Sequence, residues 1–267
     1  MDSQEIALRL REFWEAEGCP AIPSYGSIPA GGLTFDVFFG ILAPDPWCAC
    51  QVVSIVDPSV ALYDDDPLRP IIDSCLQVTR QDPSGDLRKR FIESLRVLEI
   101  DPRDRDVRFV AHGYDLSHLA ARAAGWRVLI DGIEVGSLFY VRQLGGIDLK
   151  FAPIVVEYFL RRMEFAVGIE GEKMPTERGR QIASYVLEHA NPERIGSFLS
   201  LHADECEQAL GGGLYYQAYD HVLASVYLLS VLTARDGLSA KEYATRTARI
   251  ADLARGCARA YVEATDA

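Results

Sequence analysis

The stretch 125–168 constrains the fold of this chain most. Two runs rich in Val, Ile, Leu and aromatic residues, 126–130 and 133–142, flank the dipeptide Asp131-Gly132. Asp-Gly is a strong signal for a two-residue hairpin turn, because a tight turn of this kind needs positive φ at its central residues. The sequence therefore predicts an antiparallel β-hairpin here, and with it an antiparallel sheet.

A helix is predicted after the hairpin. The pair Gly145-Gly146 interrupts the strand pattern, and Pro153 is acceptable in a first helical turn, where its missing N–H has no partner to lose. The spacing of the apolar residues that follow favours a helix from Pro153 to about Val167.

Arg162 is the charged residue that stands out on this predicted helix. Most of its neighbours at helical spacing are apolar or aromatic: Tyr158, Phe159, Phe165 and Ala166. A guanidinium group in such a stripe either extends to water from a packing edge or is held in place to bind an anion such as phosphate or carboxylate. Arg161, with Glu157 four residues before it, has instead the arrangement of a solvated ion-pair face.

Composition narrows the classes of function. The chain has 267 residues, 49% of them hydrophobic, which is enough to bury a full core. The net charge of −12 disfavours binding of a nucleic-acid backbone by bulk electrostatics, so another chain would have to hold any large polyanion. Charges interrupt every apolar run before the ~20 residues of a membrane span, and a cytoplasmic location is the expectation.

The remaining segments predict an α+β fold with two parts. Strands are expected at 48–56, 76–79 and 107–110, and helices at 4–16, 83–98, 178–189, 193–209, 215–234 and 239–264. This order favours an antiparallel sheet with flanking helices over residues 1–168 and a helical domain over 169–267. The polar segment 169–177 is the expected boundary.

Familiar catalytic motifs do not assign a function. The sequence has no Gly-rich phosphate loop of the Rossmann or Walker type and no Gly-x-Ser-x-Gly elbow, so dehydrogenase and hydrolase functions are poorly supported. His112 and His118, with Asp115 between them, are consistent with a metal or acid–base site, but their spacing fits no helical face and is equally typical of a surface loop.

Short motifs spread along the chain carry a family resemblance. They include Phe13-Trp14, Pro44-Asp45-Pro46-Trp47, Ile100-Asp101-Pro102, Asp106-Val107-Arg108-Phe109-Val110, Asp131-Gly132-Ile133-Glu134-Val135, Glu188-His189-Ala190 and Ala218-Tyr219-Asp220. Over nearly its whole length the chain resembles the α subunit of bacterial heterotetrameric glycyl-tRNA synthetase, a class II aminoacyl-tRNA synthetase. The resemblance implies a six-stranded antiparallel class II sheet, a homodimer, ATP-dependent formation of glycyl-adenylate, and a separate β subunit that handles most of the tRNA.

The phosphate-binding motifs of the family are only partly present. Where the family has Glu-Pro-Ser-Arg-Arg, this chain has residues 57–61, so Val60 and Ala61 replace two arginines expected near the ATP phosphates. Each lost charge pair removes up to about 4 kcal/mol of Coulomb attraction before desolvation. The resemblance leaves Arg69 and Arg162 as the candidate catalytic anion binders. Asp65, in the acidic loop before Arg69, is a candidate contact for Mg²⁺ if ATP activation is retained.

The resemblance also indicates an altered amino-acid pocket. Glu134, Tyr140 and Gln143 survive as candidate substrate-binding residues. The family's Thr-Gln-Phe-Thr is replaced over residues 136–139: Gly136 and Ser137 are smaller than their counterparts, whereas Phe139 is larger and apolar. A pocket with Ser137 and Phe139 is expected to differ in shape from one made for glycine.

Three hypotheses about function follow. The chain is a divergent paralogue that binds an amino-acid or aminoacyl group in the old pocket, with altered or absent ATP chemistry. Alternatively, it is a functional glycine–tRNA ligase α subunit that uses ATP and Mg²⁺. The third hypothesis is a non-catalytic binding or regulatory subunit. An active protein would be a synthetase-like ligase or an aminoacyl transfer enzyme, and its expected partners are a second copy of the chain, a small amino acid, and a β-type subunit or tRNA-bound donor in trans.

Overall fold

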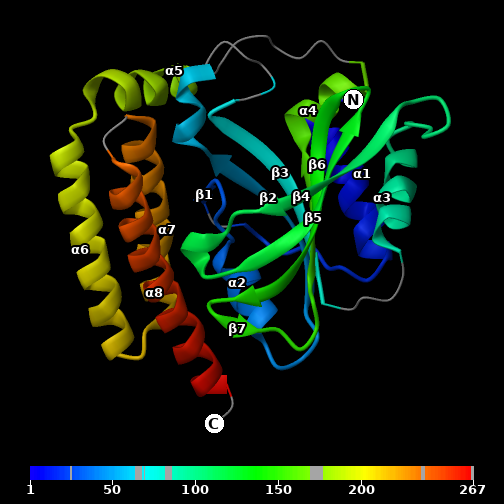
Figure 1. Cartoon of the computed structure of the whole chain (residues 1–267). Helices are drawn as coiled ribbons and strands as arrows, with labels where there is room; N and C mark the ends of the chain where they lie inside the picture. Colours follow the sequence, from blue (N-terminus) through cyan, green and yellow to red (C-terminus); the bar gives the residue numbers. More distant parts are fainter. Residues whose placement is uncertain are drawn as a thin grey trace.

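The computed structural model describes residues 1–24, 26–63, 68, 70–81, 86–168, 177–235 and 238–265. One twisted sheet stands between two groups of helices (Figure 1). Helices from the first part of the chain cover one face of the sheet, and the long helices of the C-terminal part lie against the other side.

The sheet is almost entirely antiparallel. Its strands in spatial order are β1 (Ser27–Pro29), β2 (Cys48–Val56), β3 (Ile72–Arg80), β8 (Ile154–Phe159), β6 (Ile133–Leu144), β5 (Arg122–Ile130) and β4 (Val107–Tyr114), and the short β7 (Ile147–Asp148) pairs with β6. Each neighbouring pair from β2 to β4 is antiparallel, and β1 runs parallel to β2 at the edge. The predicted α+β class with an antiparallel, class II-like sheet is confirmed.

The helices include one that was not predicted, at 35–42, and otherwise lie close to the periodic segments of the sequence. They are α1 (Ser3–Ala16), α2 (Phe35–Leu42), α3 (Leu87–Arg96), α4 (Leu160–Ala166), α5 (Glu177–Ser184), α6 (Pro192–Gly211), α7 (Tyr215–Ala234) and α8 (Ala240–Thr265). One π-helical turn, Tyr185–His189, continues α5, and 3-10 turns span Pro58–Tyr63 and Ser117–Leu119. The expected domain boundary falls almost wholly on residues 169–176, outside the described residues.

The sheet separates two apolar cores. On one face, Trp14 of α1 and Phe91 of α3 pack with the strand residue Tyr158. On the other, Phe38 of α2 stacks on Tyr219 of α7, with ring centroids 4.2 Å apart, in a core that also includes residues of α8 and of the sheet. Helices of the C-terminal part therefore bury the second face of the sheet.

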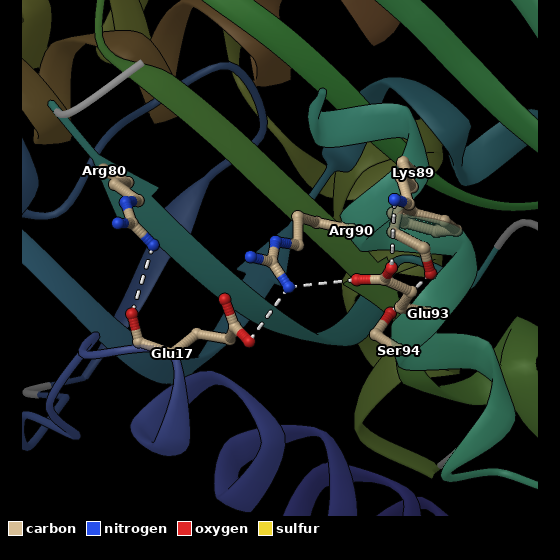
Figure 2. Close-up of polar contacts among 7 residues, drawn as sticks. Glu17, Arg80, Lys89, Arg90, Glu93 and Ser94 are labelled. Carbon is tan, nitrogen blue, oxygen red and sulfur yellow. Dashed lines mark hydrogen bonds and ion pairs between the residues drawn. The ribbon is translucent and has the colours of Figure 1, made fainter. Parts of the chain in front are cut away.

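Ion pairs at the surface link α1, β3 and α3. Figure 2 shows Arg90 of α3 between two carboxylates, 3.1 Å from Glu17 at the end of α1 and 3.1 Å from Glu93. Arg80 of β3 donates to the backbone oxygen of Glu17 over 3.1 Å. Exposed pairs of this kind contribute little stability, about 0–1 kcal/mol each, so their main effect is on the orientation of α3.

The predicted hairpin is confirmed by its turn geometry. Asp131 and Gly132 have φ of 49° and 86°, the positive values that a tight primed turn needs. β5 and β6 pair on either side of this turn, with a register shift after Val128. The turn thus fixes which residues of β6 face each side of the sheet.

The predicted helix from Pro153 to Val167 is wrong in its first half. Residues 154–159 form β8, which pairs with β3 on one side and β6 on the other, and only residues 160–166 are helical. Val155, Val156 and Tyr158 favour a strand, and hydrogen bonding to two neighbours decides for it. Consequently Glu157 does not lie on a solvated helix face, as its spacing from Arg161 had indicated. It lies in the middle of the sheet.

Candidate functional site

A cavity of about 250 Å³ opens on the sheet face opposite α1 and α3. The 28–33 loop, β3, β6, β8 and the start of α4 form its walls. Most of its lining residues are apolar or glycine, and the charged ones are Asp57, Asp73, Glu157 and Arg162. A mainly apolar cavity with a few convergent charges is the usual form of a small-molecule site.

A row of polar side chains runs along the sheet beneath this cavity, and Glu157 is its member that lines the cavity. Strand register places Gln51, Gln77, Glu157 and Ser137 side by side on β2, β3, β8 and β6. Gln51 Nε2 donates to Gln77 Oε1 over 3.3 Å, and Gln77 Nε2 donates to Glu157 Oε1 over 3.2 Å. Ser137 Oγ donates to Glu157 Oε2. Both carboxylate oxygens of Glu157 are thus held by neutral donors.

Glu157 is a half-buried carboxylate without an ion-pair partner in the described part of the chain. Burial raises its pKa above the ordinary value of 4.5, although the hydrogen bonds from Ser137 and Gln77 and the charge of Arg162 act in the opposite direction. A buried negative charge is costly unless a positive charge compensates it. The site therefore favours a cation beside Glu157.

Arg162 enters the same cavity from α4. Its guanidinium lies over the ring of Phe159, 4.2 Å from the centroid, and its Nε is 3.8 Å from Asp73 Oδ2. Nη1 donates to the backbone oxygen of Glu134 over 3.4 Å. Within the described structure, Arg162 Nε and Asp73 Oδ2 are both buried without a hydrogen bond. The ion pair between Arg162 and Asp73 is consequently loose.

Asp73 is the second buried carboxyl group of the cavity. Its side chain is 9% exposed, and burial raises its pKa while the charge of Arg162 lowers it. Since Arg162 is the nearest compensating charge, the two residues depend on one another.

Some of the predicted site residues meet here. Phe139 and Arg162 line the cavity, and Ser137 holds Glu157 at its floor. Glu134 is not among the lining residues, and its carboxylate forms an ion pair of 3.5 Å with Arg127 of β5.

Other predicted site residues are not brought into this cavity. Tyr140 points to the opposite face of the sheet, where its ring lies 6.1 Å from that of Trp126. Gln143 lies toward the far end of β6 and donates to Asp148 Oδ1 over 3.0 Å. Arg69 and Asp65 are outside the described residues.

Two functional candidates, Glu157 and Asp73, were missed by the sequence analysis. A usable signal was present, because Glu157 lies between two pairs of strand-forming residues, Val155-Val156 and Tyr158-Phe159. A single carboxylate in such a run indicates a buried charge. The helical interpretation of 153–167 hid this signal.

The two histidines do not form a joint site. His118 Nε2 contacts the backbone oxygen of Gly31 at 2.9 Å, which fixes the 28–33 loop, and burial lowers the pKa of His118. His112 lies on the edge strand β4. Among the described residues, no group of three or more His, Cys, Asp or Glu is arranged to hold a metal ion.

The described lining of the cavity matches a triphosphate poorly. Three carboxyl groups face it against one guanidinium, and Val60 lines the wall where a phosphate-binding arginine was expected. Ala61 is 1% exposed and packs in the core. The described lining thus offers a single cation, Arg162, to a ligand that carries several negative charges.

The comparisons with known proteins give the chain a family. The model of the glycyl-tRNA synthetase alpha subunit family matches residues 3–266. The chain belongs to this family. It is 28% identical over 278 residues to the glycine–tRNA ligase alpha subunit of Coprothermobacter proteolyticus, with 98% of this chain and 95% of the relative covered. It is 29% identical over 273 residues to the chloroplastic/mitochondrial glycine–tRNA ligase 2 of Arabidopsis thaliana, with 97% of this chain covered but only 26% of that relative.

The family assignment confirms the resemblance recognised in the sequence. It covers the class II-like sheet and the helical C-terminal part alike. None of the helices in the described ranges is both long and apolar enough to span a membrane.

The raised pKa values predict that stability falls as pH rises. A carboxyl group whose pKa is higher in the folded than in the unfolded chain binds its proton more tightly when folded, so stability decreases from its ordinary pKa upward. Glu157→Gln removes one such group. We therefore expect the free energy of unfolding of this variant, relative to the unaltered chain, to increase between about pH 5 and about pH 8. Urea unfolding at both pH values measures this difference.

Other charged and ionisable groups lie around Glu157. They are Asp73 and Cys75 of β3, Tyr114 of β4, Arg127 of β5, Glu134 of β6 and Arg162 of α4. The comparison with Glu157→Gln isolates the part of the pH-dependent stability that depends on Glu157. A difference that does not change with pH would contradict the raised pKa.

Proposed function

We propose that this chain is a divergent member of the glycyl-tRNA synthetase alpha subunit family that binds an amino-acid or aminoacyl group in the old synthetase pocket. In this proposal ATP-dependent activation is lost or altered. The protein acts as a cytoplasmic homodimer, and it receives or hands over its aminoacyl group with a β-type subunit or a tRNA-bound donor in trans. The net charge of −12 agrees with a division of labour in which another chain holds the tRNA.

The charge of the cavity is the observation that carries this proposal. Among the described lining residues Asp57, Asp73 and Glu157 outnumber Arg162, which favours a ligand with a positively charged group. Arg162 also lies beside Asp73 and over the ring of Phe159, so its partly compensated charge suits a single carboxyl group better than a triphosphate. An amino acid offers an ammonium for the acidic groups and a carboxyl group for the arginine.

Two alternatives predict different chemistry. A functional glycine–tRNA ligase alpha subunit would bind ATP with Mg²⁺ through Arg162, Arg69 and Asp65. A purely regulatory subunit would have no use for a charged cavity. The hydrogen-bonded placement of Glu157 favours a retained binding site over the second alternative.

Amino-acid-dependent pyrophosphate exchange, combined with calorimetric titration of ATP and of amino acids, tests the proposal. The alpha subunit of Coprothermobacter proteolyticus, with its partner subunit, provides the positive control. We expect the titration to detect binding of at least one amino acid or amino-acid ester and no binding of ATP with Mg²⁺.

Two results overturn the proposal. Exchange with glycine would identify a functional ligase, and the absence of binding by any amino acid or ester would leave the regulatory alternative.

A further inference from the structure

We propose that Glu157 binds the ammonium group of the ligand and that the ligand is an amino acid, free or as an aminoacyl group, whose side chain is apolar and larger than that of glycine. This inference rests on the proposed function and assigns a substrate class to the same cavity.

The geometry around Glu157 carries the first half of the inference. Two neutral donors, Gln77 and Ser137, orient the carboxylate from β3 and β6. These donors stabilise the carboxylate but do not neutralise it, and Arg162 forms its ion pair with Asp73 instead. A ligand ammonium would complete the site as an ion pair with an oriented, half-buried carboxylate, which is a strong form of hydrogen bond.

Arg162 supplies a second contact on the same side of the cavity. Arg162 lines the cavity, and its charge is close enough to Glu157 to affect the pKa of that group. The ammonium and the carboxyl or ester group of an amino acid are attached to one carbon, so they need an anion and a cation that lie close together. Glu157 and Arg162 meet this requirement.

The walls carry the second half of the inference. The cavity of about 250 Å³ corresponds to roughly eight water molecules at ~30 Å³ each, whereas glycine has only five non-hydrogen atoms. The residues around the remaining space are mostly apolar: Ile28, Leu33, Ile55, Val60, Leu116 and Phe139. A larger apolar side chain would fill this space and remove apolar surface from water.

Calorimetric titration with defined probes tests both halves. The probes are glycine, L-leucine, L-methionine, L-phenylalanine, L-leucine methyl ester and N-acetyl-L-leucine. We expect at least one of the three larger amino acids, or the ester, to bind about tenfold or more tightly than glycine. N-acetyl-L-leucine, which lacks the ammonium, is expected not to bind. The ester distinguishes an aminoacyl ligand from a free amino acid, because it keeps the ammonium and masks the carboxylate.

Glu157→Gln is the variant that isolates the ammonium contact. The glutamine side chain has the same shape and can keep hydrogen bonds to Ser137 and Gln77, so the fold is expected to persist, as thermal unfolding would verify. Affinity for the best probe is expected to fall about tenfold or more. Glu207→Gln, which removes an exposed carboxylate paired with Arg249 on α8, is the matched control and should leave binding unchanged.

The possible failures are distinct. If no probe binds the unaltered chain, the proposed function itself is wrong. If amino acids bind but Glu157→Gln binds them equally well, or N-acetyl-L-leucine binds as well as L-leucine, Glu157 is not the ammonium site. If glycine binds as tightly as the larger amino acids, the assignment of the substrate class is wrong.

Discussion

Replacing Arg162 with alanine is expected to abolish ligand binding and to destabilise the fold by about 2–4 kcal/mol. The destabilisation follows from Asp73, whose side chain is 9% exposed and would lose its compensating charge. Removing one partner of a buried pair leaves a desolvated charge, and this cost exceeds the value of the original attraction. Protonation of Asp73 limits the loss, because burial already raises the pKa of this group.

A second substitution separates the structural role of Arg162 from its role in binding. In the double variant Arg162→Ala/Asp73→Asn the buried charge is gone, so most of the lost stability should return. Ligand binding should not return, because the cation that faces the carboxyl group of the ligand is still absent. Urea unfolding and calorimetric titration of Arg162→Ala, Asp73→Asn and the double variant measure these changes in stability and binding. Together with the unaltered chain they form a double-mutant cycle.

Two results would contradict this account. Equal instability of Arg162→Ala and the double variant would show that Asp73 is not the group left uncompensated. Binding unaffected by Arg162→Ala would remove this residue from the site, whatever its effect on stability.

Elements with a local signal could be predicted from the sequence. The hairpin around Asp131-Gly132 was correct because positive φ at the turn is a property of those two residues. The helices of the C-terminal part were correct because apolar spacing repeats over several turns in each, most clearly in α7 and α8.

The strand β8 could not be predicted in the same way. Residues 154–159 have apolar spacing compatible with a short helix, and their pairing with β3 and β6 is a tertiary effect. The helix prediction for 153–167 puts Glu157 at the surface, although it lines the cavity. The wrong helix prediction therefore hid the position of Glu157, the residue proposed to bind the ammonium group.

The position of Tyr140 relative to Ser137 was, in contrast, open to prediction. Side chains of a strand alternate between the two faces, so residues three apart point in opposite directions unless a bulge lies between them. Ser137 faces the cavity, and Tyr140 packs on the other core. The family resemblance indicated one substrate site for Ser137 and Tyr140, whereas the strand places them on opposite faces of the sheet.

Replacing Gly136 with alanine is expected to cost more than about 4 kcal/mol of stability, a loss that only a few mechanisms produce. The sequence resemblance had suggested that a small residue here shapes the amino-acid pocket, but the structure gives a different reason for the glycine. A Cβ atom at Gly136 would lie far inside van der Waals contact with the backbone oxygen of Glu157 in β8. This obstacle is backbone in a central strand, so it cannot rotate away as a side chain would.

The matched control for this substitution is Gly113→Ala. Gly113 lies in the edge strand β4, and a Cβ atom there would have no neighbour within 4 Å. Its effect should stay within about 0.5 kcal/mol, as for most exposed substitutions. Urea unfolding of both variants measures the contrast. Because relief of the clash must push β6 away from β8, Gly136→Ala should also separate Ser137 from Glu157 and weaken amino-acid binding. Similar losses of stability in the two variants would show that β6 and β8 are not held together as closely as this structure has them.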